Sequence, residues 1–150
     1  GTKRTISSGT YRNKLAGRVP QTELVSLATP LLVPMIEEGF IFDDISNAII
    51  RTYLANSSLE GIQALILGCT HYPIIRNQIS KYFNFGIEII DSAKEVSLSL
   101  KKVLEENSLL SDSKTSSDRF FVSDYTEYFE KIARMFFGQN INLVREDIWN

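Results

Sequence analysis

Cys69 and His71 stand two positions apart, where the pattern of apolar residues changes from that of a strand to that of a helix. Residues 64–67 form a short apolar run typical of a buried strand, and Gly68 ends it. Pro73 suits the first position of a helix, so we predict a helix from Pro73 to about Phe83. Such a strand-to-helix turn lies at the carboxyl edge of an α/β sheet, where open α/β folds bind ligands.

A cysteine in this turn can act as a nucleophile or as a general base. Unpaired N–H groups at a helix N-terminus are expected close to the Cys69 sulfur, and the positive potential there favours thiolate over thiol. Thr70 and the turn amides can hold a carboxylate, and His71 can serve as acid, base or orienting donor. The simpler interpretation makes Cys69 a small core residue and His71 a helix-start residue whose ring meets a backbone carbonyl.

A cysteine hydrolase is a further alternative for this turn. It requires the imidazole of His71 to reach the Cys69 sulfur, and a third group to orient the ring. Residues two apart across a turn seldom meet in that way, so the spacing disfavours this class. At the start of the chain, the hydroxyls of Thr2 and Thr5 can cap a helix and also donate to an anion near its N-terminus, or only cap it.

Further elements are expected before the cysteine turn. The pattern predicts a short strand over Leu24–Ala28 and a helix over residues 31–38, which Gly39 ends. Asp43 begins another helix that runs to about Leu54, with acidic residues in its first turn. The side of this helix expected to face the core comprises Ile45, Ile49, Thr52 and Tyr53.

Strands and helices continue to alternate after the cysteine turn. Strands are predicted over residues 87–90, 119–123 and 141–144, and helices over 93–107 (capped by Asp91-Ser92) and from Ser123-Asp124 to Phe137, closed by Gly138. The stripe expected to face the core on the first of these helices is Val96, Leu100, Val103 and Leu104. The second helix is expected to bury Tyr128 or Phe129, Ile132, Ala133 and Phe136. Residues 108–118 are rich in serine and predict a surface loop, and the whole pattern indicates an α/β fold with a mainly parallel sheet.

Composition excludes several classes of protein. With 43% hydrophobic residues over 150 positions, the chain can bury a core as one domain or as parts of two. A net charge of −2 gives no basic surface for nucleic acid, and no apolar run approaches the roughly 18 residues of a membrane span. A single Cys argues against a disulfide scaffold, fits a reducing cytoplasm and, with a single His, disfavours structural zinc.

Four stretches resemble one enzyme family. The run Leu67-Gly68-Cys69-Thr70-His71-Tyr72-Pro73 looks like the signature around the second catalytic cysteine of bacterial glutamate racemases, members of the cofactor-independent aspartate/glutamate racemase superfamily. Residues 1–11 are similar to the family's Gly-Thr-x-x-Thr segment, residues 29–39 to its Pro-Leu-x-x-Pro-x-x-Glu stretch, and residues 121–124 to its C-terminal strand. The Cys-Thr-His-Tyr-Pro run is the most specific part, because aspartate and hydantoin racemases usually differ directly after Cys or Cys-Thr.

The resemblance implies interconversion of L- and D-glutamate by two thiols, with no cofactor and no metal. Two groups are needed because one base can only return the proton to the face it came from. By position, Cys69 is implied as the base for one enantiomer and the acid for the other, with His71 assisting it. Thr70, His71, Thr2 and Thr5 are implied as substrate contacts. Glu37 is implied as an assisting acid, the alternative being a solvated carboxylate at a helix end.

The chain departs from the family in lacking its first catalytic cysteine, which lies in an Ala-Cys-Asn-Thr segment. With one Cys it cannot perform the two-thiol reaction, and it begins with Gly rather than Met. We therefore expect the C-terminal half of a longer protein, inactive in isolation. The expected fold is an incomplete parallel-sheet sandwich of the racemase type, with its N-terminal half absent. Residues 1–91 would form the second α/β domain, and residues 92–150 would return to the first.

The resemblance also implies the setting of the full-length protein. A cytoplasmic homodimer would take the small-molecule substrate glutamate, without nucleic acid or membrane, and supply D-glutamate for peptidoglycan. Residues 92–150 are expected to be unstable alone, because their sheet is otherwise missing. The residues expected to lose packing partners are Phe120, Phe121, Ile132, Phe136 and Leu143. The alternatives are a racemase for another amino acid of the superfamily and a catalytically inactive binding or regulatory domain.

Overall fold

The computed structural model describes residues 1–150 except 112, 114–117, 138–140 and 148–150, and the side chains of residues 135 and 136. The chain divides into two compact units, Gly1–Leu100 and Lys101–Asn150. The domain boundary predicted after residue 91 stays a prediction. Two predictions, the burial of Phe136 and the helix end at Gly138, fall outside the described residues, as does much of the predicted loop over 108–118.

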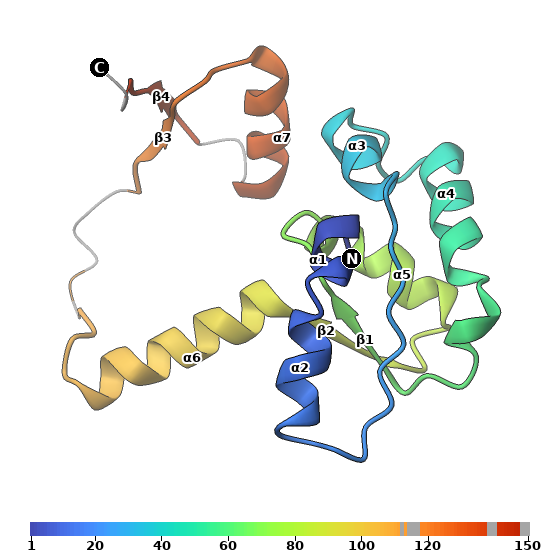
Figure 1. Cartoon of the computed structure of the whole chain (residues 1–150). Helices are drawn as coiled ribbons and strands as arrows, with labels where there is room; N and C mark the ends of the chain where they lie inside the picture. Colours follow the sequence, from blue (N-terminus) through green and yellow to red (C-terminus); the bar gives the residue numbers. More distant parts are fainter. Residues whose placement is uncertain (112, 114–117, 138–140, 148–150) are drawn as a thin grey trace. The chain divides into compact units, whose positions relative to one another are not determined.

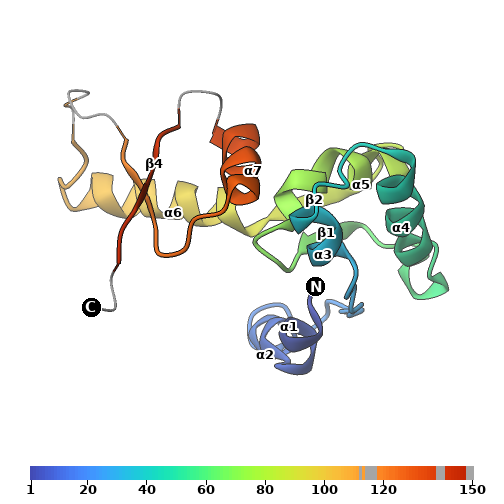
Figure 2. The ribbon, with the colours of Figure 1, turned by 90° about the horizontal axis from the view of Figure 1, so that it is seen from above.

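The first unit is built around a small parallel sheet. Strands β1 (Ala64–Leu67) and β2 (Glu88–Asp91) pair in register, Ala64 with Glu88 and Leu67 with Asp91. The connection between them comprises a 3-10 turn, η2 (Tyr72–Ile75), and the helix α5 (Arg76–Tyr82). α5 lies on one side of the sheet and α2 (Thr10–Ala16) on the other (Figures 1 and 2). The predicted parallel pairing is confirmed.

The first unit contains five further elements, the last of them only in part. They are α1 (Lys3–Ser7), α3 (Leu32–Glu37), α4 (Asp44–Leu54), η1 (Ser57–Leu59) and the start of α6 (Ser92–Glu106). The most deeply buried apolar side chains are Ile36, Leu67 and Ile75, from α3, β1 and η2. The carboxyl end of β1 and the last turn of α3 are therefore anchored in one core.

Local signals explain where α3 and α4 begin and end. The Asp43 side chain accepts a hydrogen bond of 2.6 Å from the Ser46 amide, and the Ser46 hydroxyl accepts one from the Asp43 amide. This capping box starts α4 at the predicted place. Gly39 ends α3 with a φ of +74°, a left-handed conformation that costs glycine little. Both predicted helices are confirmed.

One prediction in this unit is wrong, and another holds only in part. Residues 24–28 form no strand, because the segment lies beside neither β1 nor β2 and has backbone hydrogen bonds only to Gly1 near its end.

The core face of α4 is only partly the predicted one. Ile49 and Tyr53 pack against the core as predicted, whereas Ile45 and Thr52 are exposed. The fully buried residues are Ser46, Ile50 and Leu54. Gln78 of α5 donates hydrogen bonds to the Ser46 hydroxyl and to the Asn47 side chain. These bonds give the buried Ser46 a polar partner in the interface between α4 and α5.

The second unit contains another small parallel sheet. Strands β3 (Phe120–Val122) and β4 (Leu143–Arg145) pair in register, Phe120 with Leu143, and α7 (Glu127–Phe137) connects them (Figure 2). The predicted strands and helix are confirmed. The predicted burial holds for Ala133 and in part for Ile132, whereas Tyr128 and Phe129 are exposed. The reason is that the described sheet has only two strands to cover the helix.

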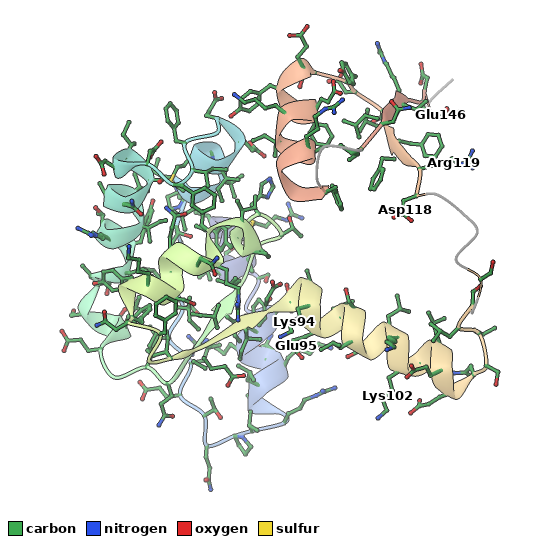
Figure 3. The ribbon with its side chains drawn as sticks, turned by 180° about the vertical axis from the view of Figure 1, so that it is seen from behind. Lys94, Glu95, Lys102, Asp118, Arg119 and Glu146 are labelled. Atoms are coloured by element: carbon green, nitrogen blue, oxygen red, sulfur yellow. The ribbon has the colours of Figure 1, made fainter. Side chains whose placement is uncertain are left out.

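Most of the stripe on α6 predicted to face the core is exposed, and Leu104 is half-buried. Asp91 caps this helix as predicted, with its Oδ1 accepting from the amides of Ala93 and Lys94. No residue of α6 is buried, and Val96, Leu100 and Val103 are each more than half exposed. Charged side chains such as Lys94, Glu95 and Lys102 project from the same helix (Figure 3). Helical spacing predicted the helix correctly, but the structure described holds no surface that covers its apolar side.

No helix in the described ranges is both long enough and apolar enough to cross a membrane.

Candidate active site

Two glycines bring the start of the chain against the cysteine turn. A Cβ atom at Gly1 would lie 3.2 Å from the carbonyl oxygen of Gly68, and a Cβ at Gly68 would lie 3.5 Å from the Cα of Gly1. A side chain at Gly1 would therefore press on the Gly68 carbonyl, whereas one at Gly68 would only make ordinary contact. This approach places α1, with Thr2 and Thr5, beside the carboxyl end of β1 (Figure 1).

His71 lies between a thiol and a carboxylate. Its Nδ1 is 3.7 Å from the Cys69 Sγ and 3.5 Å from the Thr70 Oγ1, and its Nε2 is 3.1 Å from the Glu37 Oε1. The expectation that residues two apart across this turn seldom meet is therefore wrong here. The reason is that Glu37, on α3, draws the far side of the ring and leaves Nδ1 facing the sulfur.

The Cys69–His71–Glu37 row is accessible to solvent. Cys69 is half-buried, while the side chains of His71 and Glu37 are 35% and 59% exposed. An ion pair in such a position is screened by water and contributes little to folding stability. Its arrangement nevertheless suits proton transfer, because an imidazole can take a proton from a thiol while a carboxylate orients the ring and stabilises its charged form.

The helix after the turn begins differently from the prediction. Residues Tyr72–Ile75 form a 3-10 turn, and the α-helix starts only at Arg76. The Tyr72 amide donates to the Cys69 carbonyl, and the Ile74 amide donates to the His71 carbonyl. These amides are therefore engaged, and the α-helical dipole begins a turn further along the chain than predicted. The predicted effect of a helix N-terminus on the sulfur is accordingly weaker, and the polar group described in contact with the sulfur is the imidazole.

Thr2 and Thr5 bond to each other at the start of α1. The Thr2 Oγ1 accepts a 3.1 Å hydrogen bond from the Thr5 amide and lies 2.8 Å from the Thr5 Oγ1. The capping role is confirmed. The role in holding an anion stays a prediction. One hydroxyl proton of the pair is used between the two oxygens, which leaves the other able to donate outward.

Sequence reasoning missed a buried pair beneath the site, Thr29 and Tyr72. Their side chains are 6% and 3% exposed, and the Thr29 Oγ1 lies 2.6 Å from the Tyr72 Oη. Burial raises the pKa of the Tyr72 phenol above its usual value, although the hydrogen bond to Thr29 offsets part of that rise. The available signal was position, because Tyr72 directly follows His71 and Thr29 directly precedes the segment that leads to Glu37.

The second unit holds a separate open pocket. It is lined by Arg119, Phe121, Val122, Ser123 and Glu146 at the β3–β4 sheet. The guanidinium of Arg119 lies 5.3 Å from the centroid of the Phe121 ring. None of the residues predicted to do chemistry lines this pocket. Within the described ranges, no three His, Cys, Asp or Glu residues are grouped so that they could hold a metal ion.

Comparison with known proteins gives relatives of one kind. No family model matches the chain. The glutamate racemase of Persephonella marina is 36% identical over 149 residues, which cover 99% of this chain and 54% of that relative. The glutamate racemase of Geobacter metallireducens is 33% identical over 139 residues, covering 92% of this chain and 52% of that relative.

Solved structures agree with the sequence comparison. The crystal structure of glutamate racemase from Francisella tularensis in complex with D-glutamate matches with a TM-score of 0.86 and 36% identity, covering 99% of this chain and 55% of that one. A Bacillus anthracis glutamate racemase isoform matches with a TM-score of 0.85 and 29% identity, covering 95% and 54%. In sequence and in fold, the chain is thus a relative of the glutamate racemases, and it spans about half the length of the curated relatives it matches.

Proposed function

We propose that this chain supplies one half of the active site of a glutamate racemase, with Cys69 as the thiol on one face of the substrate. The observation that carries the proposal is the Cys69–His71–Glu37 row at the carboxyl edge of a parallel sheet, in a chain related to glutamate racemases. The D-glutamate in the Francisella tularensis relative supports glutamate as the substrate.

The reaction removes the α-proton of glutamate on one face and returns a proton on the other. In one direction the Cys69 thiolate takes the α-proton, and in the other the Cys69 thiol donates one. His71, whose Nδ1 faces the sulfur, accepts the thiol proton before abstraction and releases it to solvent. In the opposite direction, the protonated ring reprotonates the Cys69 thiolate after the thiol has given its proton to the substrate. Glu37 holds the ring through Nε2 and stabilises its protonated form. The opposite thiol lies outside this chain, which contains one cysteine.

Hydroxyl groups around the turn are suited to hold the substrate carboxylates. We assign this role to Thr70, beside the sulfur, and to Thr2 and Thr5, which the approach of Gly1 to Gly68 brings to the same edge. By this proposal the remaining half belongs to the N-terminal side, and residues 92–150 return to its domain. The complete protein is a cytoplasmic homodimer that provides D-glutamate for peptidoglycan and needs neither cofactor nor metal.

A second candidate is a catalytically inactive binding domain that has kept the turn. A missing second thiol on the N-terminal side would favour it, because one base cannot invert a stereocentre by itself.

The test is a chimera in which this chain replaces the matching segment of the Persephonella marina glutamate racemase, called the Persephonella chimera below. L-Glutamate and D-glutamate are incubated separately in D₂O, and optical rotation and α-deuterium uptake are followed. We expect racemisation with deuterium uptake in the chimera, and a loss of roughly 10³-fold or more in its Cys69→Ala variant. Cys69→Ser and the unmodified relative serve as matched controls.

The outcomes distinguish the glutamate racemase from the alternative functions. Full activity of the Cys69→Ala variant would make Cys69 a core residue and overturn the proposal. A folded chimera that binds D-glutamate without exchanging its α-proton would favour the inactive binding domain. A folded chimera that racemises another amino acid instead would move the assignment within the superfamily. Circular dichroism and thermal unfolding establish that each variant is folded.

A further inference from the structure

We propose that Thr29 and Tyr72 form a buried clamp that holds Glu37 against His71, and that both act as positioning residues for the proposed reaction. The geometric part of this inference is independent of the reaction, and its catalytic part rests on the proposed function. Neither side chain touches the sulfur or the imidazole in the hydrogen bonds described, so the pair acts through the segments it joins.

The clamp joins two segments that are distant in the sequence. Tyr72 is the residue after His71, and Thr29 begins the stretch that continues through Pro30 into α3, whose last residue is Glu37. Their hydroxyl oxygens lie 2.6 Å apart in a buried setting. The position of Glu37 relative to His71 is therefore coupled to this contact, together with the apolar packing that anchors Ile36 at the end of the short helix α3.

The same pair reaches the start of the chain. The Thr29 amide donates to the Gly1 carbonyl at 2.9 Å, and the Thr29 Oγ1 lies within donating distance of the same carbonyl, at 3.3 Å. The Tyr72 hydroxyl in turn lies within donating distance, 3.4 Å, of the Thr29 carbonyl. Each hydroxyl has one proton, so one of the two donates across the 2.6 Å contact and the other donates to its neighbouring carbonyl. Burial favours the protonated phenol by raising the Tyr72 pKa.

The two contacts, His71–Glu37 and Thr29–Tyr72, differ in their exposure to solvent, and this difference indicates which of them holds the segments together. The His71–Glu37 pair is well exposed, with 35% and 59% of the side-chain surfaces accessible, so water competes for it and it cannot hold two segments together. The Thr29–Tyr72 bond is buried, and breaking it leaves a polar atom without water to replace the lost partner. The buried bond is thus the cause of the alignment, and the exposed pair is its result.

The single histidine makes the test direct. The 150-residue chain is labelled with ¹⁵N-histidine, and the imidazole ¹⁵N resonances of His71 are recorded for wild type and four variants. Glu37→Gln gives the spectrum of a ring that has lost its carboxylate. Tyr72→Phe and Thr29→Val remove one hydroxyl each with little change in shape, and Thr29→Ser keeps the hydroxyl. A fifth variant, Tyr53→Phe, is the matched control, because its hydroxyl accepts from the Leu31 amide in the same segment and is not part of the Thr29–Tyr72 bond.

We expect Tyr72→Phe and Thr29→Val to move the His71 resonances at least half of the way to those of Glu37→Gln. Thr29→Ser should restore the wild-type spectrum, and Tyr53→Phe should leave it unchanged. Wild-type resonances in both Tyr72→Phe and Thr29→Val would overturn the proposal, as would a Glu37→Gln spectrum identical to that of wild type. If Tyr72→Phe fails to fold by circular dichroism, the comparison of Thr29→Val with Thr29→Ser decides.

Kinetics of the Persephonella chimera test the catalytic part. Tyr72→Phe and Thr29→Val should lower kcat about tenfold and change KM less than twofold, because the substrate hydroxyl contacts remain while the proton relay is misaligned. Thr29→Ser should restore kcat. Unchanged kcat in both variants would overturn the positioning role. An inactive parent chimera would count against the proposed function. The clamp itself would then be decided by the NMR result alone.

Discussion

The Glu37 carboxylate lies 3.1 Å from the Nε2 of His71, although the two residues belong to segments on opposite sides of α4 and β1 in the sequence. The contact orients the imidazole so that its other nitrogen faces the Cys69 sulfur at 3.7 Å. One carboxylate therefore turns a cysteine and a histidine that are neighbours in the chain into a candidate proton relay.

Removing the charge of Glu37 should slow the reaction. Glu37→Gln keeps the shape and a polar contact to Nε2 but no longer stabilises a protonated ring, so we expect kcat of the Persephonella chimera to fall roughly tenfold. The factor is modest because the pair is exposed and water screens the lost charge. Glu38→Gln, at the neighbouring position, is the matched control. Equal rates for wild type and Glu37→Gln would show that the carboxylate has no part in the chemistry.

The thiol of Cys69 should react in the folded chain. It is half-buried beside an imidazole that can accept its proton, whereas a fully buried core thiol is inert. Treatment of the 150-residue chain with iodoacetamide should therefore give one adduct, counted by mass spectrometry, and Cys69→Ser should give none. His71→Asn should slow the reaction several-fold. An adduct that forms only in urea would indicate that Cys69 is a core residue.

The two units should differ in amide hydrogen exchange. The first unit has a continuous core around Ile36, Leu67 and Ile75, whereas the buried apolar residues described in the second are Ala133 and Ile141. We expect slow exchange in β1 and β2 and exchange close to that of an unfolded chain in β3 and β4, because local opening is easiest where few apolar contacts are lost. Strong protection of β3 and β4 in the isolated chain would contradict this expectation.

Stability should depend on the Tyr72 phenol at high pH. Burial places the pKa of Tyr72 in the folded chain above its unfolded value of about 10, so the folded state holds the proton more tightly. The stabilisation that comes from this difference in pKa is complete below the unfolded pKa and is lost as the pH rises through the folded pKa. In urea unfolding at a series of pH values, the stability advantage of wild type over Tyr72→Phe should shrink above about pH 10. A difference that stays constant with pH would contradict the assignment.

Local signals were sufficient for most of the elements. The capping box of Asp43 and Ser46, Gly39 at the end of α3 and the apolar run of β1 each act within a few residues, so their patterns predicted the right structure. The strand predicted over residues 24–28 is wrong because a strand does not depend on local signals alone. The composition of this segment suits a strand, but a strand needs a partner, and the sheet described for this unit consists of β1 and β2 alone.

The sequence by itself determined the residue types available for chemistry: one thiol, one imidazole and a hydroxyl between them, at a turn between a strand and a helix. The tertiary structure alone decided that Glu37 meets His71, that Thr29 meets Tyr72 and that most of the apolar stripe of α6 is exposed. These relationships depend on how segments distant in the chain pack together. Residue spacing carries no information about such packing, because helical and strand periods describe one element at a time.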